Sequence, residues 1–277
     1  MKFRPFGNTG MNVSEIGLGA WQLANPDWGV SDRNEALRII QKSLEAGCNF
    51  FDTAPGYGGG RSEELLGEGL KPVRKDVILC TKFGHTAEGL TDFSTNAIRP
   101  SIEASLRTLQ TDYLDIVLMH NPPRDIMDGR VASQYEEFEK LKAEGKIREY
   151  GVSLDWREEV DLVIDTTKSK ALEVFFNALY QDPLPAFQKA YEQGVVARRS
   201  ELVEQFAKLV PEGTSMAHAA LQFILAQPQV STIIPGAKSV EQALDNFAAA
   251  EKHLSPEVVQ SMVDLWEREI MSDPLPW

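Results

Sequence analysis

The sequence predicts an α/β fold, a single (β/α)8 TIM barrel that spans residues 1–277 and carries an N-terminal β-hairpin and an extra C-terminal helix. Short apolar segments with strand character alternate with segments of helical periodicity along the whole chain. A length of 277 residues falls in the normal range for one such barrel, and no Pro-rich linker or low-complexity tract divides it. These observations favour one domain.

The hairpin is expected at the start of the chain, where Asn8, Thr9 and Gly10 separate two strand-like segments. Eight apolar strands are expected after it, at Ile16–Ala20, Asn49–Asp52, Val77–Lys82, Leu114–His120, Ile147–Ser153, Glu173–Asn177, Val195–Arg198 and Thr232–Pro235. Helical periodicity predicts the intervening helices at Arg33–Ala46, Arg61–Leu70, Thr95–Leu109, Ala132–Glu144, Asp155–Asp165, Leu184–Glu192 and Thr214–Ala226. A further helix, Ser239–Glu251, follows the last strand, and Pro256–Glu269 is the added C-terminal helix.

The composition excludes several classes of function. Asp and Glu total 41 against 28 for Lys and Arg, a formal charge of −13, which argues against a nucleic-acid partner because such a surface needs clustered cations. No apolar segment approaches the ~20 residues of a membrane span, and the N-terminus lacks a signal-peptide core. Cys48 and Cys80 lie in apolar segments and are expected to be buried free thiols. We therefore expect a cytoplasmic protein with no membrane partner and no evident obligate protein partner.

Ionisable side chains gather where three consecutive strands end. Asp52 ends the second strand and Tyr57 follows in its loop, Lys82 ends the third strand, and His120 ends the fourth. Each alone has an ordinary interpretation, such as an exposed cap for Lys82 or a hydrogen-bonded loop residue for His120. Because barrel active sites lie at the carboxyl ends of the strands, neighbouring strands would bring these four side chains together.

The chemistry of this cluster is proton donation from a phenol. Tyrosine titrates near pH 10, and an ammonium ~4 Å away at an effective dielectric constant of ~20 favours the phenolate by roughly 4 kcal/mol. The ammonium of Lys82 is therefore expected to lower the pKa of Tyr57 by up to ~3 pH units. Asp52 would keep that ammonium charged, and His120 would orient a carbonyl oxygen. A phenol that protonates an alkoxide needs a hydride donor, which implies a nicotinamide cofactor.

Four segments resemble those of the aldo-keto reductase family in its order and at its spacing: FFDTAPGYGGGRSEELLGEGL, TKF, LRTLQTDYLDIVLMHNP and LKAEGKIREYGVS. The resemblance runs from about Gly7 to Leu254. It implies that Asp52, Tyr57, Lys82 and His120 are the family's acid–base tetrad, and that the protein reduces aldehydes or ketones with NAD(P)H. By the same resemblance NADPH is preferred to NADH and no metal is needed.

The segment STIIPGAKSVEQALDNF, at the end of the eighth strand, predicts a binding site for a phosphate. Gly236 and its successors lead directly into a helix, whose free N–H groups and dipole favour an anion, and Lys238 adds a positive charge. An ordinary helix cap with a solvated lysine is the alternative. The resemblance implies that Lys238 and Ser239 hold the adenosine 2′-phosphate of NADPH, while Gln242 and Asn246 face the adenine.

The expected nicotinamide site departs from the family pattern. Family members often carry Gly-Val-Ser-Asn after the fifth strand, where Ser and Asn hold the carboxamide. This chain has Ser153 followed by Leu154, so the second polar residue is missing. Asn177 and Tyr180 stand where the family commonly has Gln and Tyr, and core packing is the alternative for Tyr180.

The segment after the seventh strand also departs from the family, because GVVARRS continues straight into the helix-like ELVEQFAKLVPEG. Related proteins commonly have a long loop here that folds over the cofactor pyrophosphate. Arg198 is then expected to be one of the nearest phosphate partners. If this loop is truly absent, weaker cofactor binding and faster release are expected, because fewer groups would order around the pyrophosphate.

The substrate pocket is expected to have apolar walls, which suit a small carbonyl compound of modest polarity. Its candidate residues lie in the loops after the first, third and fourth strands: Trp21, Trp28, Phe83, His85 and Asn121. The C-terminal segment MSDPLPW could complete the pocket, and core packing is the alternative for either tryptophan.

Two other classes of function are compatible with a barrel of this kind. A regulatory or sensor barrel could bind the cofactor with negligible turnover, but the intact tetrad argues against it. A barrel isomerase or hydrolase could use Asp52 and His120 as an acid–base pair, but this leaves Tyr57, Lys82 and the helix start at Lys238 without a role. NADPH oxidation with a reactive aldehyde would argue against the regulatory or sensor class. Absence of NADPH binding would favour the isomerase or hydrolase class.

Overall fold

The computed structural model describes residues 1–25, 29–176, 181, 209–269 and 271, and it has the fold of a (β/α)8 barrel. Six parallel strands form one curved sheet in the order β3-β4-β5-β6-β7-β8. Their bounds are Leu18–Gly19, Phe50–Asp52, Ile78–Phe83, Leu114–His120, Ile147–Leu154 and Ala171–Val174. Ile233, from the expected eighth strand, and Gly236, the residue after that strand, form parallel bridges to Ile16 and to Gly19 of β3. The expected seventh strand, Val195–Arg198, lies outside the described residues.

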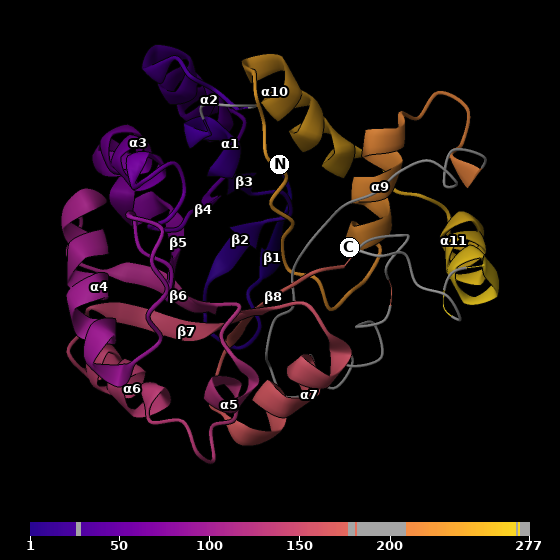
Figure 1. Cartoon of the computed structure of the whole chain (residues 1–277). Coiled ribbons are helices and arrows are strands. Elements are labelled where there is room, and N and C mark those ends of the chain that lie inside the picture. Colours follow the sequence, from indigo (N-terminus) through magenta and orange to yellow (C-terminus); the bar gives the residue numbers. More distant parts are fainter. Residues whose placement is uncertain (26–28, 177–180, 182–208, 270, 272–277) are drawn as a thin grey trace.

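The predicted N-terminal hairpin is confirmed. Strands β1 (Phe3–Pro5) and β2 (Asn12–Ser14) pair antiparallel, and Figure 1 shows them across the middle of the barrel. Phe6, in the turn of this hairpin, stacks on Phe50 of β4 with ring centroids 6.0 Å apart. The hairpin therefore closes one end of the barrel with apolar side chains.

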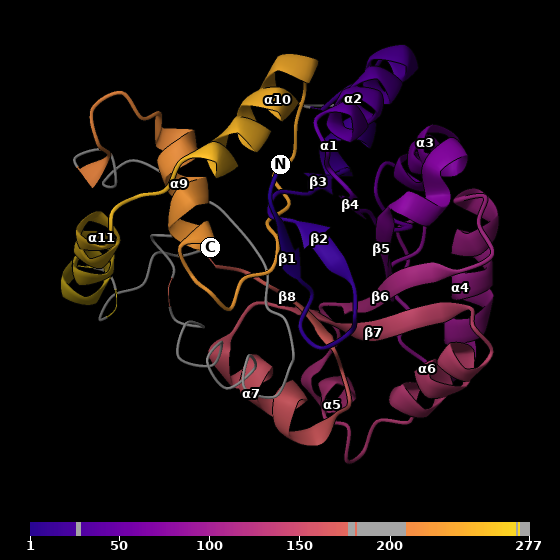
Figure 2. The same cartoon turned by 180° about the vertical axis from the view of Figure 1, so that it is seen from behind.

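Helices surround the outer face of the sheet (Figures 1 and 2). Those after β3 to β7 are α1 (Trp21–Ala24), α2 (Arg33–Glu45), α3 (Arg61–Leu70), the 3-10 helix η1 (Lys71–Asp76), α4 (Thr95–Thr108), α5 (Arg124–Met127), α6 (Gln134–Ala143) and α7 (Arg157–Thr166). Every residue of β5 is buried, because this strand lies between the barrel interior and the helix layer. This arrangement explains why the strands read as continuous apolar segments.

The C-terminal part of the chain returns to the start of the barrel. It contains α9 (Met216–Leu225), α10 (Val240–Ala248), the 3-10 helix η3 (Ala249–Glu251) and α11 (Pro256–Glu269), the last of which is the predicted added helix. Helix α10 packs beside α2, as both figures show. Within the described residues, none of the helices has the combined length and hydrophobicity that crossing a bilayer requires.

The boundary of β8 differs from the prediction. The strand was expected at Glu173–Asn177, but it spans Ala171–Val174 and pairs with β7 through Ser153 and Glu173. Glu173 is therefore the third residue of β8 and not its first. The apolar character of this segment is compatible with either set of bounds, and the pairing with β7 decides between them.

Candidate active site

Three neighbouring strands bring the predicted ionisable residues together. Asp52 ends β4, Lys82 is the penultimate residue of β5, and His120 ends β6. The side chain of Lys82 is fully buried, and its Nζ donates hydrogen bonds to Asp52 Oδ1 at 2.7 Å and to the carbonyl oxygen of Thr53 at 3.1 Å. Burial of an ammonium is costly unless it is paired, and these two acceptors meet that need.

A second carboxylate reaches Lys82 from the opposite side of the barrel. Glu173 Oε2 lies 3.4 Å from Lys82 Nζ, and the Glu173 residue is only 5% exposed. Glu173 was not among the residues predicted for this site. The signal that could have found it is the single acidic residue inside the apolar segment ALEVFF.

Tyr57 lies against this buried charge cluster. Lys82 Nζ is 5.1 Å from the centroid of the Tyr57 ring, and the His120 ring meets the same phenol edge to face at 5.8 Å. The Tyr57 loop is held at its base by a hydrogen bond from Thr53 Oγ1 to Ser62 Oγ at 2.7 Å. The predicted association of Asp52, Tyr57, Lys82 and His120 is present in the structure.

Gly58 allows the loop to bring Tyr57 to this position. Its φ is +59°, a left-handed conformation that favours glycine. A side chain there would also place its Cβ 2.4 Å from the carbonyl oxygen of Ala24, in α1. The glycine-rich sequence after β4 is therefore needed for close packing of the loop on α1.

The electrostatic balance at Tyr57 differs from the sequence-based expectation. Burial raises the pKa of the phenol, and the Lys82 charge lowers it, but the Asp52 and Glu173 carboxylates raise it again. The net direction is upward, so the expected lowering of the pKa was wrong. The physical reason is that burial removes the water that would solvate a phenolate, and two carboxylates offset the single ammonium.

Lys82 remains charged in this environment. Burial lowers the pKa of its ammonium, but the Asp52 and Glu173 carboxylates raise it by more, so the net direction is upward. The site therefore holds a permanent cation next to a protonated phenol. That combination can donate a proton to an oxygen on which negative charge develops.

His120 is positioned by a second histidine. The Nε2 of His85 lies 3.1 Å from the carbonyl oxygen of His120, and the two rings are edge to face at 5.0 Å. This hydrogen bond requires the proton of His85 on Nε2, because a carbonyl oxygen only accepts. His85 was expected in the substrate pocket, and in the structure it supports the end of β6.

Ser153 and Asn121 form a polar pair at the ends of β7 and β6. Ser153 Oγ donates to Asn121 Oδ1 at 2.8 Å, and Asn121 Nδ2 donates to Asp155 Oδ2 at 3.1 Å. Ser153 was predicted as a cofactor ligand and Asn121 as a substrate-pocket residue. Asn121 thus places a second polar side chain beside Ser153, whereas Leu154 is buried and apolar.

The predicted phosphate site lies at the start of α10. Ser239 caps the helix, with its Oγ accepting from the Gln242 backbone N–H at 3.1 Å, and Gln242 Oε1 accepts from the Lys238 backbone N–H at 2.7 Å. Asn246 Nδ2 donates to the Gly236 carbonyl oxygen at 3.2 Å. These five predicted residues are therefore neighbours in space. Their donor set of a lysine, a hydroxyl and two amides suits a phosphorylated nucleotide.

Phe83 does not belong to the mouth of the barrel. It is 1% exposed, and its ring packs edge to face against Phe93 at 5.9 Å and Phe138 at 6.2 Å. Successive residues of a strand point to opposite faces, so Lys82 points into the barrel and Phe83 points toward the helices. The expectation that Phe83 forms a wall of the substrate pocket was therefore wrong.

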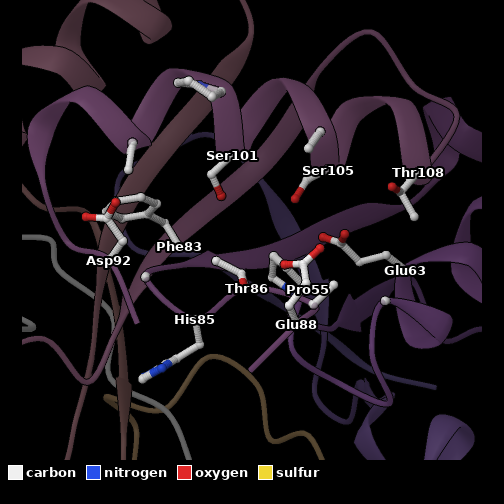
Figure 3. Close-up of a pocket in the computed structure, with 16 residues that line it drawn as sticks. Pro55, Glu63, Phe83, His85, Thr86, Glu88, Asp92, Ser101, Ser105 and Thr108 are labelled. Carbon is white, nitrogen blue, oxygen red and sulfur yellow. The ribbon is translucent and has the colours of Figure 1, made fainter. Parts of the chain in front are cut away.

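A pocket of about 330 Å³ lies on the helix side of β5 (Figure 3). It is bounded by Phe83, Glu63 of α3, Ser101 and Ser105 of α4, and the loop that contains Glu88. The buried carboxyl of Glu63 accepts a hydrogen bond from Thr81 Oγ1 at 2.7 Å. This pocket includes none of the four tetrad residues.

Trp21 contacts the tetrad directly. Its ring lies 6.1 Å from that of Tyr57, and it is 43% exposed, which fits a wall at the mouth of the barrel. Four other predicted site residues lie outside the described residues: Trp28, Asn177, Tyr180 and Arg198. Among the described residues, no group of three His, Cys, Asp or Glu side chains is arranged to hold a metal ion.

Comparisons with known proteins give similar sequences and a similar fold. The sequence model of the Aldo/keto reductase family matches residues 15–197 and 175–267. L-galactose dehydrogenase from Arabidopsis thaliana is 32% identical over 283 residues, covering 90% of this chain and 88% of the relative. The NADH-specific methylglyoxal reductase of Escherichia coli (strain K12) is 27% identical over 310 residues, covering 92% and 95%. The solved structure of the aldo-keto reductase AKR11C1 from Bacillus halodurans, in its holo form, superposes with a TM-score of 0.85 and 31% identity, covering 96% of each chain.

Proposed function

This chain belongs to the aldo/keto reductase family of NAD(P)H-dependent oxidoreductases, and from this premise we propose that it reduces small aldehydes or ketones to alcohols with NADPH, using Tyr57 as the proton donor. The observation that carries the proposal is the buried Lys82, which donates a hydrogen bond to Asp52 and faces the ring of Tyr57. Cys48 and Cys80 are buried thiols that are not joined in a disulfide, which supports our expectation of a cytoplasmic location.

Each tetrad residue has a separate task in the proposed reaction. A nicotinamide cofactor, when bound, would supply the hydride that the carbonyl carbon needs. Tyr57 donates its phenolic proton to the carbonyl oxygen. Lys82 stabilises the phenolate that remains, and Asp52 holds the Lys82 ammonium in place through their 2.7 Å hydrogen bond. His120, whose ring meets Tyr57 at 5.8 Å, orients the carbonyl oxygen toward the phenol.

The raised pKa of Tyr57 is consistent with an acid role. Burial raises the pKa of the phenol more than Lys82 lowers it, so Tyr57 stays protonated at neutral pH. A general acid must carry its proton at the start of the reaction. Transfer becomes favourable only as hydride arrives and the carbonyl oxygen becomes an alkoxide, which is a much stronger base than the carbonyl.

Two clusters support binding of a nicotinamide dinucleotide. The Ser153–Asn121 pair at the ends of β7 and β6 offers a hydroxyl and an amide, which suit the nicotinamide carboxamide. Lys238 and Ser239, at the start of α10, suit a phosphate. One relative is named NADH-specific, so family membership alone does not select the nicotinamide. Our preference for NADPH depends on Lys238, because a 2′-phosphate is what its charge would recognise.

The test is a panel of carbonyl compounds assayed with NADPH and with NADH, alongside the Tyr57→Phe variant. We expect NADPH oxidation with at least one aldehyde, and loss of that activity in Tyr57→Phe while NADPH binding, followed by fluorescence, is retained. Turnover that survives in Tyr57→Phe would exclude Tyr57 as the proton donor. NADPH binding without turnover on any carbonyl would favour a cofactor-binding regulatory barrel.

A further inference from the structure

Glu173 is a buried charged residue to which the proposed reaction gives no task. It lies on β8, while Lys82 lies on β5, and strands β6 and β7 separate them in the sheet. The 3.4 Å approach of Glu173 Oε2 to Lys82 Nζ therefore crosses the interior of the barrel. A glutamate in this position needs a reason, because a buried carboxylate is destabilising unless it is well paired.

The geometry around Lys82 supplies one reason. An ammonium has three N–H donors. One is directed to Asp52 Oδ1 and one to the carbonyl oxygen of Thr53, both on the β4 side of the ammonium. Glu173 approaches from β8, so the ammonium is held between carboxylates on two sides of the barrel.

The charges in the cluster supply a second reason. The groups that face Lys82 and Tyr57 among the described residues are Asp52 from β4, the Cys80 thiol on β5, His120 from β6 and Glu173 from β8. Two carboxylates, Asp52 and Glu173, thus accompany the one ammonium. Asp52 alone would balance the Lys82 charge one to one, and Glu173 adds a second negative charge beside it.

We propose that Glu173 is a positioning residue that holds Lys82 from the side opposite Asp52 and offsets part of the ammonium charge that acts on Tyr57. The proposal depends on the proposed function, because it assigns Glu173 to the same proton-donating site. Its consequence is that Tyr57 keeps its proton to higher pH than a cluster of one carboxylate and one ammonium would allow. Reduction should then persist into the alkaline range, since the protonated phenol is the active form for this direction.

Glu173→Gln removes the charge while keeping the size of the side chain. A negative charge disfavours phenolate, so its removal should let Tyr57 ionise more readily. We expect Tyr57 to titrate about one pH unit lower in this variant, from Coulomb interaction across several ångströms of partly screened protein. The alkaline limb of the reduction rate should move to lower pH by the same amount, and the rise of the alcohol-oxidation rate, which needs phenolate, should move with it.

Two further variants serve as controls. Glu173→Asp keeps the charge, so its titration should stay close to that of the wild type. Glu63→Gln removes another buried carboxyl, one that is hydrogen-bonded to Thr81 on the helix side of β5, and it should leave the Tyr57 titration unchanged. Circular dichroism at each pH confirms that every variant is folded over the range compared.

The primary readout is independent of turnover. Ultraviolet absorbance of phenolate is recorded against pH for the wild type and each variant, and subtraction of the matching Tyr57→Phe protein isolates Tyr57 from the other tyrosines. An unchanged Tyr57 titration in Glu173→Gln, or an equal shift in Glu63→Gln, overturns the proposal. If Glu173→Gln does not fold, the Tyr57 titration of the wild type still tests the proposal. Ionisation of Tyr57 below the ordinary tyrosine range would overturn it, because the Lys82 charge would then outweigh both carboxylates.

This design separates the two proposals. If Glu173→Gln shifts the titration but the wild type reduces no carbonyl compound, the role of Glu173 toward Lys82 and Tyr57 stands and the proposed function fails. If the wild type reduces carbonyls and its pH profile is the same in Glu173→Gln, the proposed function stands and Glu173 is a structural residue only.

Discussion

Replacement of Lys82 by methionine should destabilise the protein in a way that depends on pH. Lys82 is fully buried, and its Nζ lies 2.7 Å from Asp52 Oδ1 and 3.4 Å from Glu173 Oε2. Lys82→Met keeps an unbranched side chain of similar length but leaves two carboxylates buried without their cation. Removal of one partner from a buried ion pair typically costs about 3–5 kcal/mol.

This cost can be measured by denaturant unfolding at neutral pH. For a chain of 277 residues the entropy of unfolding is about 0.6 kcal/mol/K, so the melting temperature should fall by roughly 5–9 °C. In the variant, the buried carboxyls hold protons more tightly than they do in the unfolded chain. Stability should therefore fall as pH rises from about 4 toward neutrality, and the deficit relative to the wild type should be smallest in acid.

A matched control is Lys140→Met, because Lys140 is an exposed lysine of α6 with a 3.2 Å ion pair to Glu137. Such surface pairs contribute about 1 kcal/mol or less. The double variant Lys82→Met with Asp52→Asn should recover part of the lost stability, since it removes one of the two stranded charges. A Lys82→Met protein that unfolds with the wild-type free energy, or a deficit that does not shrink in acid, would refute this account of the buried cluster.

Two further predictions concern the loop and the phosphate site. Lys238→Ala should weaken NADPH binding by about tenfold or more, as expected for the loss of a charged contact worth about 1.5–3 kcal/mol, and should change NADH binding little. An equal loss of affinity for both nicotinamides in a fluorescence titration would contradict a 2′-phosphate role. Gly58→Ala should lower kcat through displacement of Tyr57 and should cost about 1–2 kcal/mol of stability. The reason is that a Cβ at φ +59° would lie 2.4 Å from the Ala24 carbonyl oxygen. Wild-type kcat and an unchanged melting temperature would show that the loop does not need glycine there.

Many elements could be predicted from the sequence because their signals are local. The bounds of α3 at Arg61–Leu70, of β6 at Leu114–His120 and of α11 at Pro256–Glu269 agree with the prediction. In each case the periodicity of apolar residues and the flanking turn or cap residues lie within the element itself. The bounds of β8 show the limit, since an apolar segment does not specify where a strand begins and ends until a neighbouring strand pairs with it.

Phe83 illustrates a signal that was present but was not used. Strand residues alternate between two faces, so an inward Lys82 already requires an outward Phe83. The structure confirms this alternation, with Phe83 packed against Phe93 and Phe138. The pairing of Ser153 with Asn121 is different, because it depends on the loop after β6 and on the positive φ of Asn121, which the sequence does not specify.

The order of the strands along the chain was enough to bring Asp52, Tyr57, Lys82 and His120 to one site, because adjacent parallel strands end at the same edge of a barrel. Only the tertiary structure revealed that Glu173 joins them from across the barrel and that the pKa of Tyr57 is raised. The reason is that electrostatic effects depend on through-space distance and on the loss of water. Both of these are set by the packing of segments far apart in the sequence, whereas strand and helix patterns are set by neighbouring residues.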